Sequence, residues 1–383
     1  MEIEERLNSE LLTRKERNAY RELKIVKNLV DFSSNDYLGF AQHADLKNNI
    51  LKKLQELRRI GSTGSRLLTG NHSLTIKLEE EVATFHSSAA ALFFNSGYDA
   101  NSGLIACVAK RKDTIFYDAL IHASLREGIR LSNSNTFSFK HNDIIDLENK
   151  LQIPSEGLKF IVVESVYSMD GDICMLNEIV DLAEKYNAVI ILDEAHATGV
   201  IGKTGAGLAQ YLKVEKKIFA RVHTCGKAIG SNGAFVLGSE TLRNYLINFC
   251  RSFIYSTAPN LMQVIAVAEA YKLLEASETI IRQLQENCEY FKQQIARFKN
   301  IRLLPSASAI FSVLIPGNED VKLAATYMQN AGYDVRPILS PTVANGAERL
   351  RICMHSYNTK LEIDRLIKLL EQITEFINRD SEK

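Results

Sequence analysis

The sequence predicts an α/β protein with a mostly parallel central sheet and a smaller α+β domain in its C-terminal part. The first observation is length, because 383 residues exceed a single small core and suggest two or three domains of about 150 residues each. The second is a repeated alternation of unbroken apolar runs, such as FIVVE and AVIILD, with amphipathic stretches, which is typical of parallel strands covered on both faces. The third is a change of pattern after residue 259, where long helical patterns dominate.

The central part of the chain supplies the strands of the predicted sheet. Apolar runs predict strands at residues 90–95, 114–117, 136–139, 160–164, 188–193, 218–224 and 234–238. Periodic patterns between them predict helices at residues 98–109, 122–131, 144–151 and 176–186. Each of the first four strands is followed by a helix, which is the repeating unit of a parallel sheet.

The C-terminal part reads as a smaller α+β unit. Its patterns predict helices at residues 261–275, 278–298, 321–330 and 360–377, and strands at 309–315 and 349–354. We therefore expect a helical and strand segment at 1–45, a large α/β domain at 46–258 and a small α+β domain at 259–383. No linker rich in Pro or Gly separates them, so we expect the units to be interlocked. We also expect the first 35 or so residues to pack with the small domain or against a partner.

Charge and composition exclude several classes of function. The 46 basic and 46 acidic side chains cancel, which leaves no basic surplus for nucleic acid or anionic lipid. No apolar run is long enough to span a membrane, and the charged N-terminus lacks the apolar core of a signal peptide. The six cysteines are scattered without metal-ligand spacing, as in a reduced cytoplasmic protein. We expect a cytoplasmic protein that binds no metal, nucleic acid or membrane.

Three segments stand where ligands of open α/β sheets bind, at the carboxyl ends of strands. The first is Asn95-Ser96-Gly97-Tyr98, between a predicted strand and a predicted helix. Gly97 permits a tight turn, and the free N–H groups of the following helix can bind an anion. Such turns are common, so this one taken alone indicates an ordinary connection.

The second segment is Asp193-Glu194-Ala195-His196, at the end of the strongest predicted strand. A buried carboxylate needs a partner, and a protonated pyridine nitrogen is one; a structural Asp that caps the next helix is the alternative. The DEAH string also occurs in helicases, and residues 197–204 weakly match a P-loop. A P-loop, however, follows its own strand, with the metal-binding carboxylate on a different strand, which argues against a helicase.

The third segment, HTCGKAIG, places Lys227 among small residues just after a predicted strand. A lysine that is shielded from water has a lowered pKa and can act as an amine nucleophile and base. A surface lysine in a glycine turn is the alternative, and it is favoured for an isolated Gly-Lys pair. The order along the chain of an anion-binding turn, Asp193 and Lys227 favours the functional interpretation.

Segments along nearly the whole chain resemble the α-oxoamine synthases, a family of enzymes that depend on pyridoxal 5'-phosphate (PLP). They are FSSNDYLGF (32–40), GSTGSRLLTGN (61–71), NSGYDAN (95–101), DALIHASLREG (118–128), ESVYSMDGD (164–172), LDEAHATGVIGKTGAG (192–207), HTCGKAIG (223–230), YSTAPN (255–260) and RLRI (349–352). The resemblance implies the fold type I of PLP-dependent transferases, which is that of aspartate aminotransferase.

The resemblance also implies roles for individual residues around the cofactor. Lys227 would carry PLP as a Schiff base, Asp193 would pair with the pyridine nitrogen, and His196 would bind the ring oxygen O3' with Ser168 nearby. His122 would stack on the ring, although a solvent-facing residue at a helix start is its alternative. The remaining cofactor contacts would go to the phosphate: backbone N–H groups of Gly97 and Tyr98, the hydroxyl of Thr224, and Ser256 and Thr257 from the neighbouring subunit of a homodimer.

The amino-acid substrate would be held by Asn35 and Arg351. Arg349 and Arg351 alternate with apolar residues and point the same way, so periodicity does not choose between them, and the resemblance favours Arg351. Glu164 is a further candidate. The family has other residue types where Cys225, Ser165 and Met175 stand, but none of these departures removes a group with a chemical role.

The resemblance implies condensation of an amino acid with an acyl-CoA thioester, followed by decarboxylation. FSSNDYLGF is most similar to the members that use L-alanine with pimeloyl-CoA, or a pimeloyl carrier protein, in biotin synthesis, and Arg21 would there meet the distal pimeloyl carboxylate. The alternatives are members that join glycine or serine to acetyl-, succinyl- or palmitoyl-CoA. A different class, a non-catalytic PLP-fold binding protein, is disfavoured because Lys227, Asp193, His196 and His122 are all retained.

Overall fold

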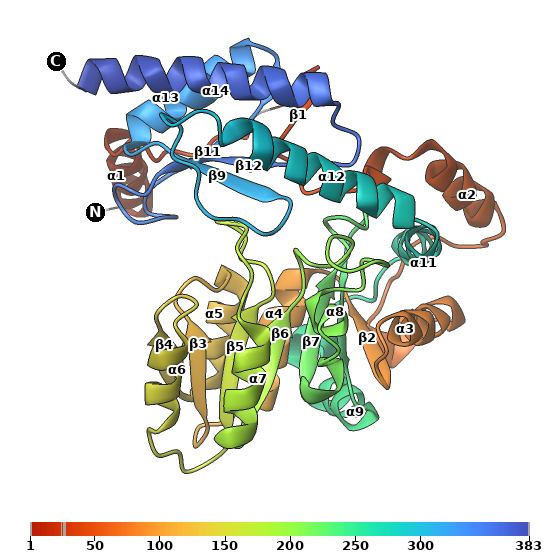
Figure 1. Ribbon diagram of the computed structural model, residues 1–383. Coiled ribbons are helices and arrows are strands. Elements are labelled where there is room, and N and C mark those ends of the chain that lie inside the picture. Colours follow the sequence, from red (N-terminus) through yellow and green to blue (C-terminus); the bar gives the residue numbers. More distant parts are fainter. Residues whose placement is uncertain (1, 24, 26–27, 382–383) are drawn as a thin grey trace. The chain divides into compact units, whose positions relative to one another are not determined.

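The computed structural model describes residues 2–23, 25 and 28–381, and the chain forms two compact units (Figure 1). Unit 1 contains the residues up to Ser34, a short piece at Met169–Gly171 and the residues from Gln283 onward. Unit 2 contains Asn35–Ser168 and Asp172–Arg282. The chain therefore passes from one unit to the other four times.

Unit 2 is built on a seven-stranded sheet in the order β2-β8-β7-β6-β5-β3-β4. The strands are β2 (Ala90–Phe94), β3 (Thr114–Asp118), β4 (Asn135–Phe139), β5 (Lys159–Glu164), β6 (Ala188–Asp193), β7 (Ala220–Thr224) and β8 (Ala234–Gly238). Four neighbouring pairs are parallel, and only β8 runs antiparallel to its neighbours β2 and β7. The mostly parallel sheet that the sequence predicts is confirmed.

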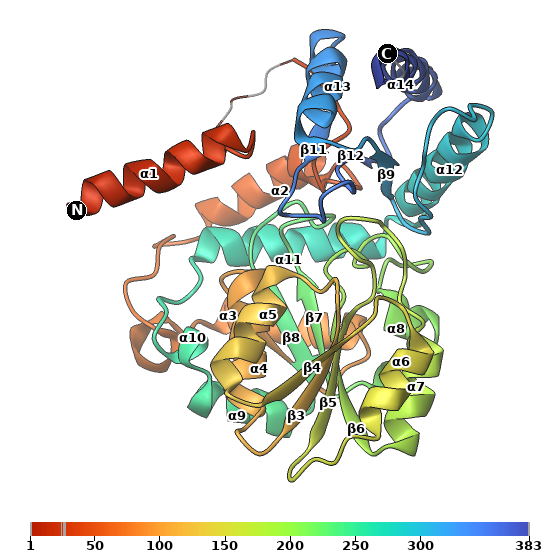
Figure 2. The ribbon, with the colours of Figure 1, turned by 90° about the vertical axis from the view of Figure 1, so that its left-hand side faces the viewer.

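Helices cover both faces of this sheet (Figure 2), with α6 and α7 on one side and α4 and α5 on the other. The helices of unit 2 are α2 (Ala44–Gln55), α3 (Ser73–Phe85), α4 (Gly97–Val108), α5 (Ala123–Ser132), α6 (Ile144–Leu151), α7 (Leu176–Lys185), α8 (Leu208–Tyr211), α9 (Glu240–Phe249), α10 (Arg251–Ile254) and α11 (Leu261–Glu275). Because both faces are covered, central strands such as β5 and β6 are apolar along almost their whole length and buried.

Unit 1 contains a three-stranded antiparallel sheet and a two-stranded parallel one, in the orders β11-β12-β9 and β1-β10. Helix α13 contacts α14 and strand β12. The elements are α1 (Ile3–Glu16), β1 (Val30–Asp31), β9 (Ile310–Leu314), α13 (Asn318–Asn330), β10 (Tyr333–Asp334), β11 (Arg336–Ile338), β12 (Arg349–Cys353) and α14 (Lys360–Ser381). Helix α12 (Glu278–Ile295) spans the boundary between the units.

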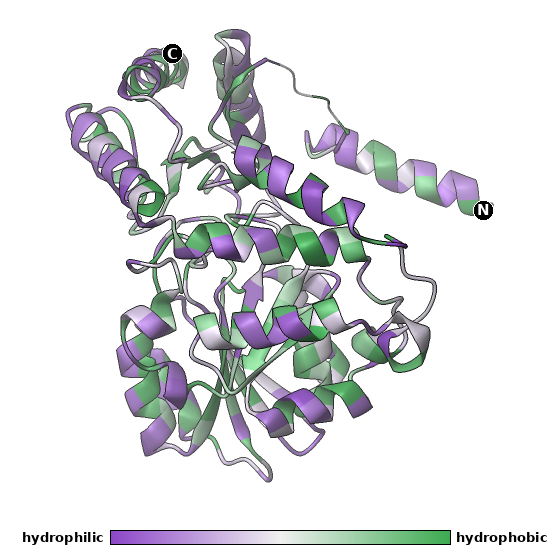
Figure 3. Ribbon diagram, turned by 90° about the vertical axis from the view of Figure 1, so that its right-hand side faces the viewer, coloured by the Kyte–Doolittle hydropathy of each residue, from purple (hydrophilic) through white to green (hydrophobic). Residues whose placement is uncertain are grey.

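The two units differ from the three predicted segments. Helix α11 packs on α2 and α3 and so lies with unit 2, not with the C-terminal residues. The predicted N-terminal segment is divided: its residues up to Ser34 belong with unit 1, in which β1 pairs with β10, and its residues from Asn35 onward belong with unit 2. Helix α1 buries none of its side chains, and apolar and polar residues alternate along it (Figure 3). Within the described residues, no helix is long and apolar enough to cross a membrane.

Candidate active site

The strand ends of unit 2 bring the predicted cofactor residues to one edge of the sheet. Strands β5, β6 and β7 are parallel, and β2 points the same way because β8 is antiparallel to both β2 and β7. Glu164, Asp193 and Thr224 are the last residues of their strands, and Gly97 begins the helix after β2. Ligands of open α/β sheets bind at this edge, so the positions agree with a binding site.

Asp193 is a buried carboxylate with two donors already in place. Asp193 is only 4% exposed to solvent. Oδ2 accepts a hydrogen bond from Nδ2 of Asn101 at 2.7 Å, and Oδ1 accepts one from the backbone N–H of Ala195 at 2.8 Å. Each carboxylate oxygen has a further lone pair, so Asp193 can also accept a hydrogen bond from a protonated pyridine nitrogen.

His122 is the N-cap of α5, where its Nδ1 accepts a hydrogen bond from the backbone N–H of Ser124. Its backbone N–H donates to Oε1 of Glu164. His122 has an exposed surface, but its imidazole ring also packs against many protein atoms. This partial desolvation lowers the pKa of His122. The negative charge of Asp193 opposes this shift of the His122 pKa, and the positive charge of Lys227 adds to it. His122 therefore favours the neutral form.

Glu164 is fully buried beside Asp193, its partner in the β5–β6 register. Burial raises the pKa of Glu164 well above its ordinary value, and the charge of Asp193 raises it further. Lys227 and the N–H of His122 act in the opposite direction on this pKa. Because two adjacent carboxylates resist a second charge, the raised pKa of Glu164 favours its protonated form.

Lys227 follows β7 by three residues and is half-buried. Its turn is fixed by backbone hydrogen bonds, from the Gly230 N–H to the Lys227 carbonyl at 2.7 Å and from the Cys225 N–H to the Gly233 carbonyl at 2.8 Å. The positive charge of Lys227 lowers the pKa values of both His122 and Glu164. Lys227 follows β7 at the sheet edge where the parallel strands β5 and β6 also end.

The turn after β2 has the features of a phosphate site. Ser96 caps α4 by accepting a hydrogen bond from the N–H of Asp99, the third residue of the helix. The N–H groups of the first two helical residues, Gly97 and Tyr98, can therefore bind an anion. A Cβ atom at Gly97 would lie 3.3 Å from Oγ1 of Thr224, which leaves little room for any side chain. Thr224 donates to the Gly233 carbonyl at 3.3 Å, and the side chain of Tyr98 is 49% exposed.

His196 is held by a tyrosine that the sequence analysis did not single out. Its Nδ1 lies 2.8 Å from the hydroxyl of Tyr37, and that hydroxyl donates to Oδ1 of Asn35 at 3.1 Å. Tyr37 is fully buried, and His196 is nearly so. The structure therefore brings together His196 and Asn35, two residues for which the sequence predicts cofactor and substrate roles.

Three further predicted cofactor residues, Ser168, Ser256 and Thr257, lie in loops of unit 2. Ser168 is half-buried and is the last residue before the chain passes into unit 1. Ser256 and Thr257 follow α10, and the carbonyl of Thr257 accepts a hydrogen bond from Nδ2 of Asn95 in the phosphate turn at 2.9 Å. Their contact with a neighbouring subunit stays a prediction.

The two arginines of β12, in unit 1, differ in burial and in their partners. Arg349 is buried, binds Asp170 as an ion pair, and donates from Nε to the Ala347 carbonyl at 2.8 Å. Arg351 is only half-buried, and its Nη1 lies 3.1 Å from Sγ of Cys353. Since Arg349 is engaged in the fold, Arg351 is the better candidate for a substrate carboxylate. Arg21 is exposed and donates to the hydroxyl of Thr342 at 3.5 Å.

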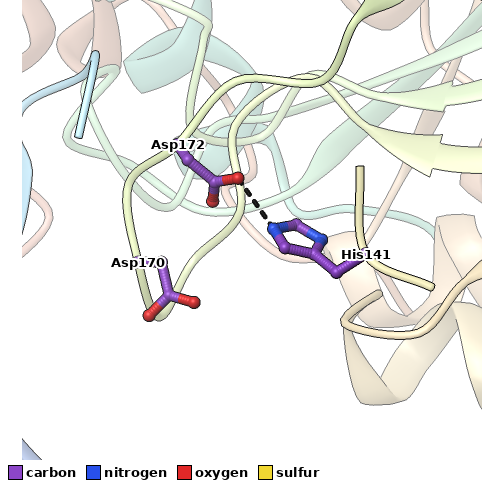
Figure 4. A group of neighbouring side chains, drawn as sticks. All are labelled: His141, Asp170 and Asp172. Atoms are coloured by element: carbon purple, nitrogen blue, oxygen red, sulfur yellow. Dashed lines mark hydrogen bonds and ion pairs between the residues drawn. The ribbon is translucent and has the colours of Figure 1, made fainter. Parts of the chain in front are cut away.

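A charged cluster fixes the loop that follows β5. His141 contacts Oδ1 of Asp118, at the end of β3, at 2.9 Å. It also contacts Oδ2 of Asp172 at 2.7 Å (Figure 4). Burial alone would lower the pKa of His141, but the hydrogen bonds and charges of the two carboxylates outweigh it and raise the pKa to about 9. Asp170, also drawn in Figure 4, belongs to unit 1. The pairs with Asp118 and Asp172 anchor the loop inside unit 2.

Two residues missed by the sequence analysis complete the site of unit 2, besides Tyr37. Asn101 binds Asp193, and Ser124 binds both Asn101 and His122. All three lie inside segments that carry the family resemblance, so a polar residue within such a segment was the available signal. Together the groups fit PLP: a lysine, a charged acceptor for the ring nitrogen and a glycine turn for the phosphate.

Comparisons with known proteins agree with this fit. Residues 27–370 match the model of the aminotransferase class I and II family. The 8-amino-7-oxononanoate synthase of Lysinibacillus sphaericus is 39% identical over 348 residues, which cover 91% of this chain and 89% of that protein.

Solved structures give the same fold. The 8-amino-7-oxononanoate synthase of Francisella tularensis matches with a TM-score of 0.79 and 28% identity, over 91% of this chain and 98% of that one. A serine palmitoyltransferase of S. paucimobilis with a bound PLP–myriocin aldimine matches with a TM-score of 0.89 over 97% of each chain, at 24% identity. The predicted fold type I of PLP-dependent transferases is confirmed.

Proposed function

Because this chain belongs to the class I and II aminotransferase family, and within it to the PLP-dependent α-oxoamine synthases, we propose that it joins L-alanine to a pimeloyl thioester to give 8-amino-7-oxononanoate. The observation that carries the proposal is that His122, Asp193 and Lys227 stand at the carboxyl ends of the parallel strands β3, β6 and β7, at one sheet edge. The curated relatives with this activity match the chain along most of its length. The acyl donor is pimeloyl-CoA or a pimeloyl carrier protein.

PLP, when bound, supplies an electron sink for the negative charge that develops at Cα of the amino acid. In the proposed mechanism, Asp193 would accept a hydrogen bond from the protonated ring nitrogen, in addition to those from Asn101 and the Ala195 N–H, and so hold that proton in place. Glu164 stays protonated because its pKa is raised by burial and by Asp193. One negative charge therefore faces the ring.

Lys227 is the covalent anchor of the cofactor and the base that moves the proton at Cα. A neutral amine is needed for this step, and Lys227 is half-buried. His122 would stack on the ring of the cofactor, and His196, held by the hydroxyl of Tyr37, would bind O3'. The N–H groups at Gly97 and Tyr98, with the hydroxyl of Thr224, hold the phosphate.

Arg351 and Asn35 bind the carboxylate of the amino acid in this proposal. A guanidinium group binds a carboxylate through two parallel hydrogen bonds, and this fixes the direction of the bond that breaks at Cα. Arg349 is committed to Asp170 and does not take part. Arg21, which is exposed near Thr342, meets the distal carboxylate of the pimeloyl chain.

The enzyme works in the cytoplasm as a homodimer with shared active sites, in which Ser256 and Thr257 reach the phosphate of the neighbouring subunit. Exposure of the Thr257 side chain supports this assignment, because its carbonyl is tied to Asn95 while its hydroxyl group lies at an exposed position.

A substrate panel tests the proposal directly. Alanine, glycine and serine are each combined with acetyl-, succinyl-, pimeloyl- and palmitoyl-CoA, and thiol release and product mass are measured, with Lys227→Ala as the inactive control. We expect turnover to be highest with alanine and pimeloyl-CoA. Preference for another pair would contradict the substrate assignment, and absence of turnover with every pair, including pimeloyl carrier protein, would favour a non-catalytic binding protein.

A further inference from the structure

A continuous line of buried hydrogen bonds joins Asp193 to His122. Nδ2 of Asn101 lies 2.7 Å from Oδ2 of Asp193 and 3.0 Å from Oγ of Ser124. Oγ of Ser124 lies 2.8 Å from Nδ1 of His122. Asn101, Ser124 and Asp193 are all buried, so water does not compete for these groups and each proton has a definite place.

The charge of Asp193 sets the orientation of the Asn101 amide. An ionised carboxylate only accepts hydrogen bonds, so the amide nitrogen, not the oxygen, faces it. This orientation leaves the buried Oδ1 of Asn101 without a hydrogen-bond partner among the described atoms. A reversed amide would place that oxygen against the carboxylate, which is worse. The two hydrogens of Nδ2 therefore point at Asp193 and Ser124.

The hydroxyl of Ser124 then has one direction left for its own hydrogen. Its oxygen accepts from Asn101, and its neighbour at 2.8 Å on the other side is Nδ1 of His122. The backbone N–H of Ser124 also points at the same Nδ1, at 3.2 Å. Two independent donors thus face one ring nitrogen, so Nδ1 carries a lone pair and no hydrogen.

We propose that Asn101 and Ser124 are positioning residues that hold His122 as the neutral tautomer with its hydrogen on Nε2. A proton on Nδ1 would face the backbone N–H of Ser124, which is a donor and cannot accept it, so the imidazolium form is disfavoured even with Asp193 nearby. The lowered pKa of His122 agrees with this. The tautomer follows from the hydrogen bonds alone. Its value for catalysis rests on the proposed function: the imidazole ring that would stack on the cofactor is then neutral, so it adds no second positive charge beside Lys227.

The nitrogen signals of the imidazole ring test the assignment without any use of activity. The holoenzyme is labelled with [15N]histidine, and the chain's eight histidines are separated in long-range 1H–15N spectra; His122→Asn identifies the signals of interest. We expect, at neutral pH, an Nδ1 signal typical of an unprotonated nitrogen and an Nε2 signal typical of a protonated one. A protonated Nδ1, in the other tautomer or the imidazolium, would overturn the proposal.

Substitutions test whether Asn101 and Ser124 are the cause. Ser124→Ala should move the two nitrogen signals toward each other and raise the pKa of His122, whereas Ser124→Thr keeps the hydroxyl and should restore the wild-type pattern. Asn101→Ala should act in the same direction as Ser124→Ala, but more weakly. Ser102→Ala is the matched control on α4, because the Ser102 hydroxyl binds the Tyr98 carbonyl outside this line of bonds.

Kinetics provide a second measurement on the same variants. Ser124→Ala should lower kcat roughly tenfold, as expected for a lost hydrogen bond to a charge-sensitive group, with little change in KM for the acyl donor. Unchanged nitrogen signals in both Ser124→Ala and Asn101→Ala would refute the proposal whatever the kinetics. If the substrate panel fails while the nitrogen signals agree, the proposed function is wrong and the tautomer assignment stands.

Discussion

The hydroxyl of Tyr37 lies 2.8 Å from Nδ1 of His196 and donates to Asn35. Tyr37→Phe should lower kcat/KM roughly fivefold to tenfold, because His196 and Asn35 each lose a buried partner while the ring packing is kept. Steady-state kinetics with alanine as the varied substrate measure this. Tyr211→Phe is the control, because Tyr211 is 64% exposed; equal kinetics for the two variants would contradict a role of Tyr37 in the site.

Substitution of Arg349 should lower stability, whereas substitution of Arg351 should weaken substrate binding. Arg349→Ala leaves Asp170 without its partner and should lower the free energy of unfolding by about 3 kcal/mol, as is usual for breaking a buried ion pair. Arg351→Ala should instead raise KM for the amino acid about a hundredfold with nearly wild-type stability. Chemical denaturation and kinetics separate the two effects, and a reversal of these effects would exchange the roles.

Arg21 should affect one substrate only. Arg21→Ala should raise KM for pimeloyl-CoA roughly tenfold, since a charge-assisted hydrogen bond to the distal carboxylate is lost, and leave KM for alanine unchanged. Arg17→Ala, at another exposed arginine of the same segment, is the control. A matching change in both variants would mean that Arg21 contributes only general charge.

Asp193→Asn should weaken PLP binding and lower kcat by about two orders of magnitude, because a neutral amide no longer holds the ring nitrogen protonated. Equilibrium dialysis of PLP and single-turnover kinetics measure the two effects. Asp181→Asn, at an exposed position of α7, controls for loss of a carboxylate. Wild-type kcat in Asp193→Asn would contradict the pairing.

His141 should stabilise the fold in a pH-dependent way. Its folded-state pKa is about 9 against an ordinary value of 6.5, so its contribution is complete below about pH 6.5 and is lost as the pH rises through about 9. The difference in unfolding free energy between wild type and His141→Gln should shrink across that window. Asp172→Asn removes one of the two carboxylate charges and should reduce the pH dependence; a difference that is constant from pH 6 to pH 10 would refute it.

The sequence predicted the sheet of unit 2 well because its signals are local. Apolar runs such as 160–164 are buried and stand out from the amphipathic helices around them. The sequence analysis predicted no element between residues 41 and 89, where α2 and α3 lie. Helix α2 buries only Leu46 among its residues, so its pattern is weak. Strands β1 and β10 are two residues long and exist through pairing with each other, which no local pattern indicates.

The site was predictable to the extent that its residues directly follow strands. Asp193, His196 and Lys227 could be placed in this way, and the resemblance added their roles. Asn101 and Ser124 lie on helices, and their contacts with Asp193 and His122 depend on how those helices are rotated on the sheet. Spacing along the chain does not determine that rotation, and so the line of hydrogen bonds emerged only from the structure.

The pairing of β1 with β10 also bears on how the protein is made. Val30 leaves the ribosome about 300 residues before its partner Tyr333, while domains generally fold as units during synthesis. Unit 2 contains no residue beyond Arg282, so all of its segments are synthesised while β1 still has an unpaired edge. Unit 1 assembles last, after β10 has been synthesised, and a ribosome-bound chain halted near residue 330, with all of unit 2 outside the ribosome, should hold a folded unit 2 and a protease-sensitive N-terminal segment.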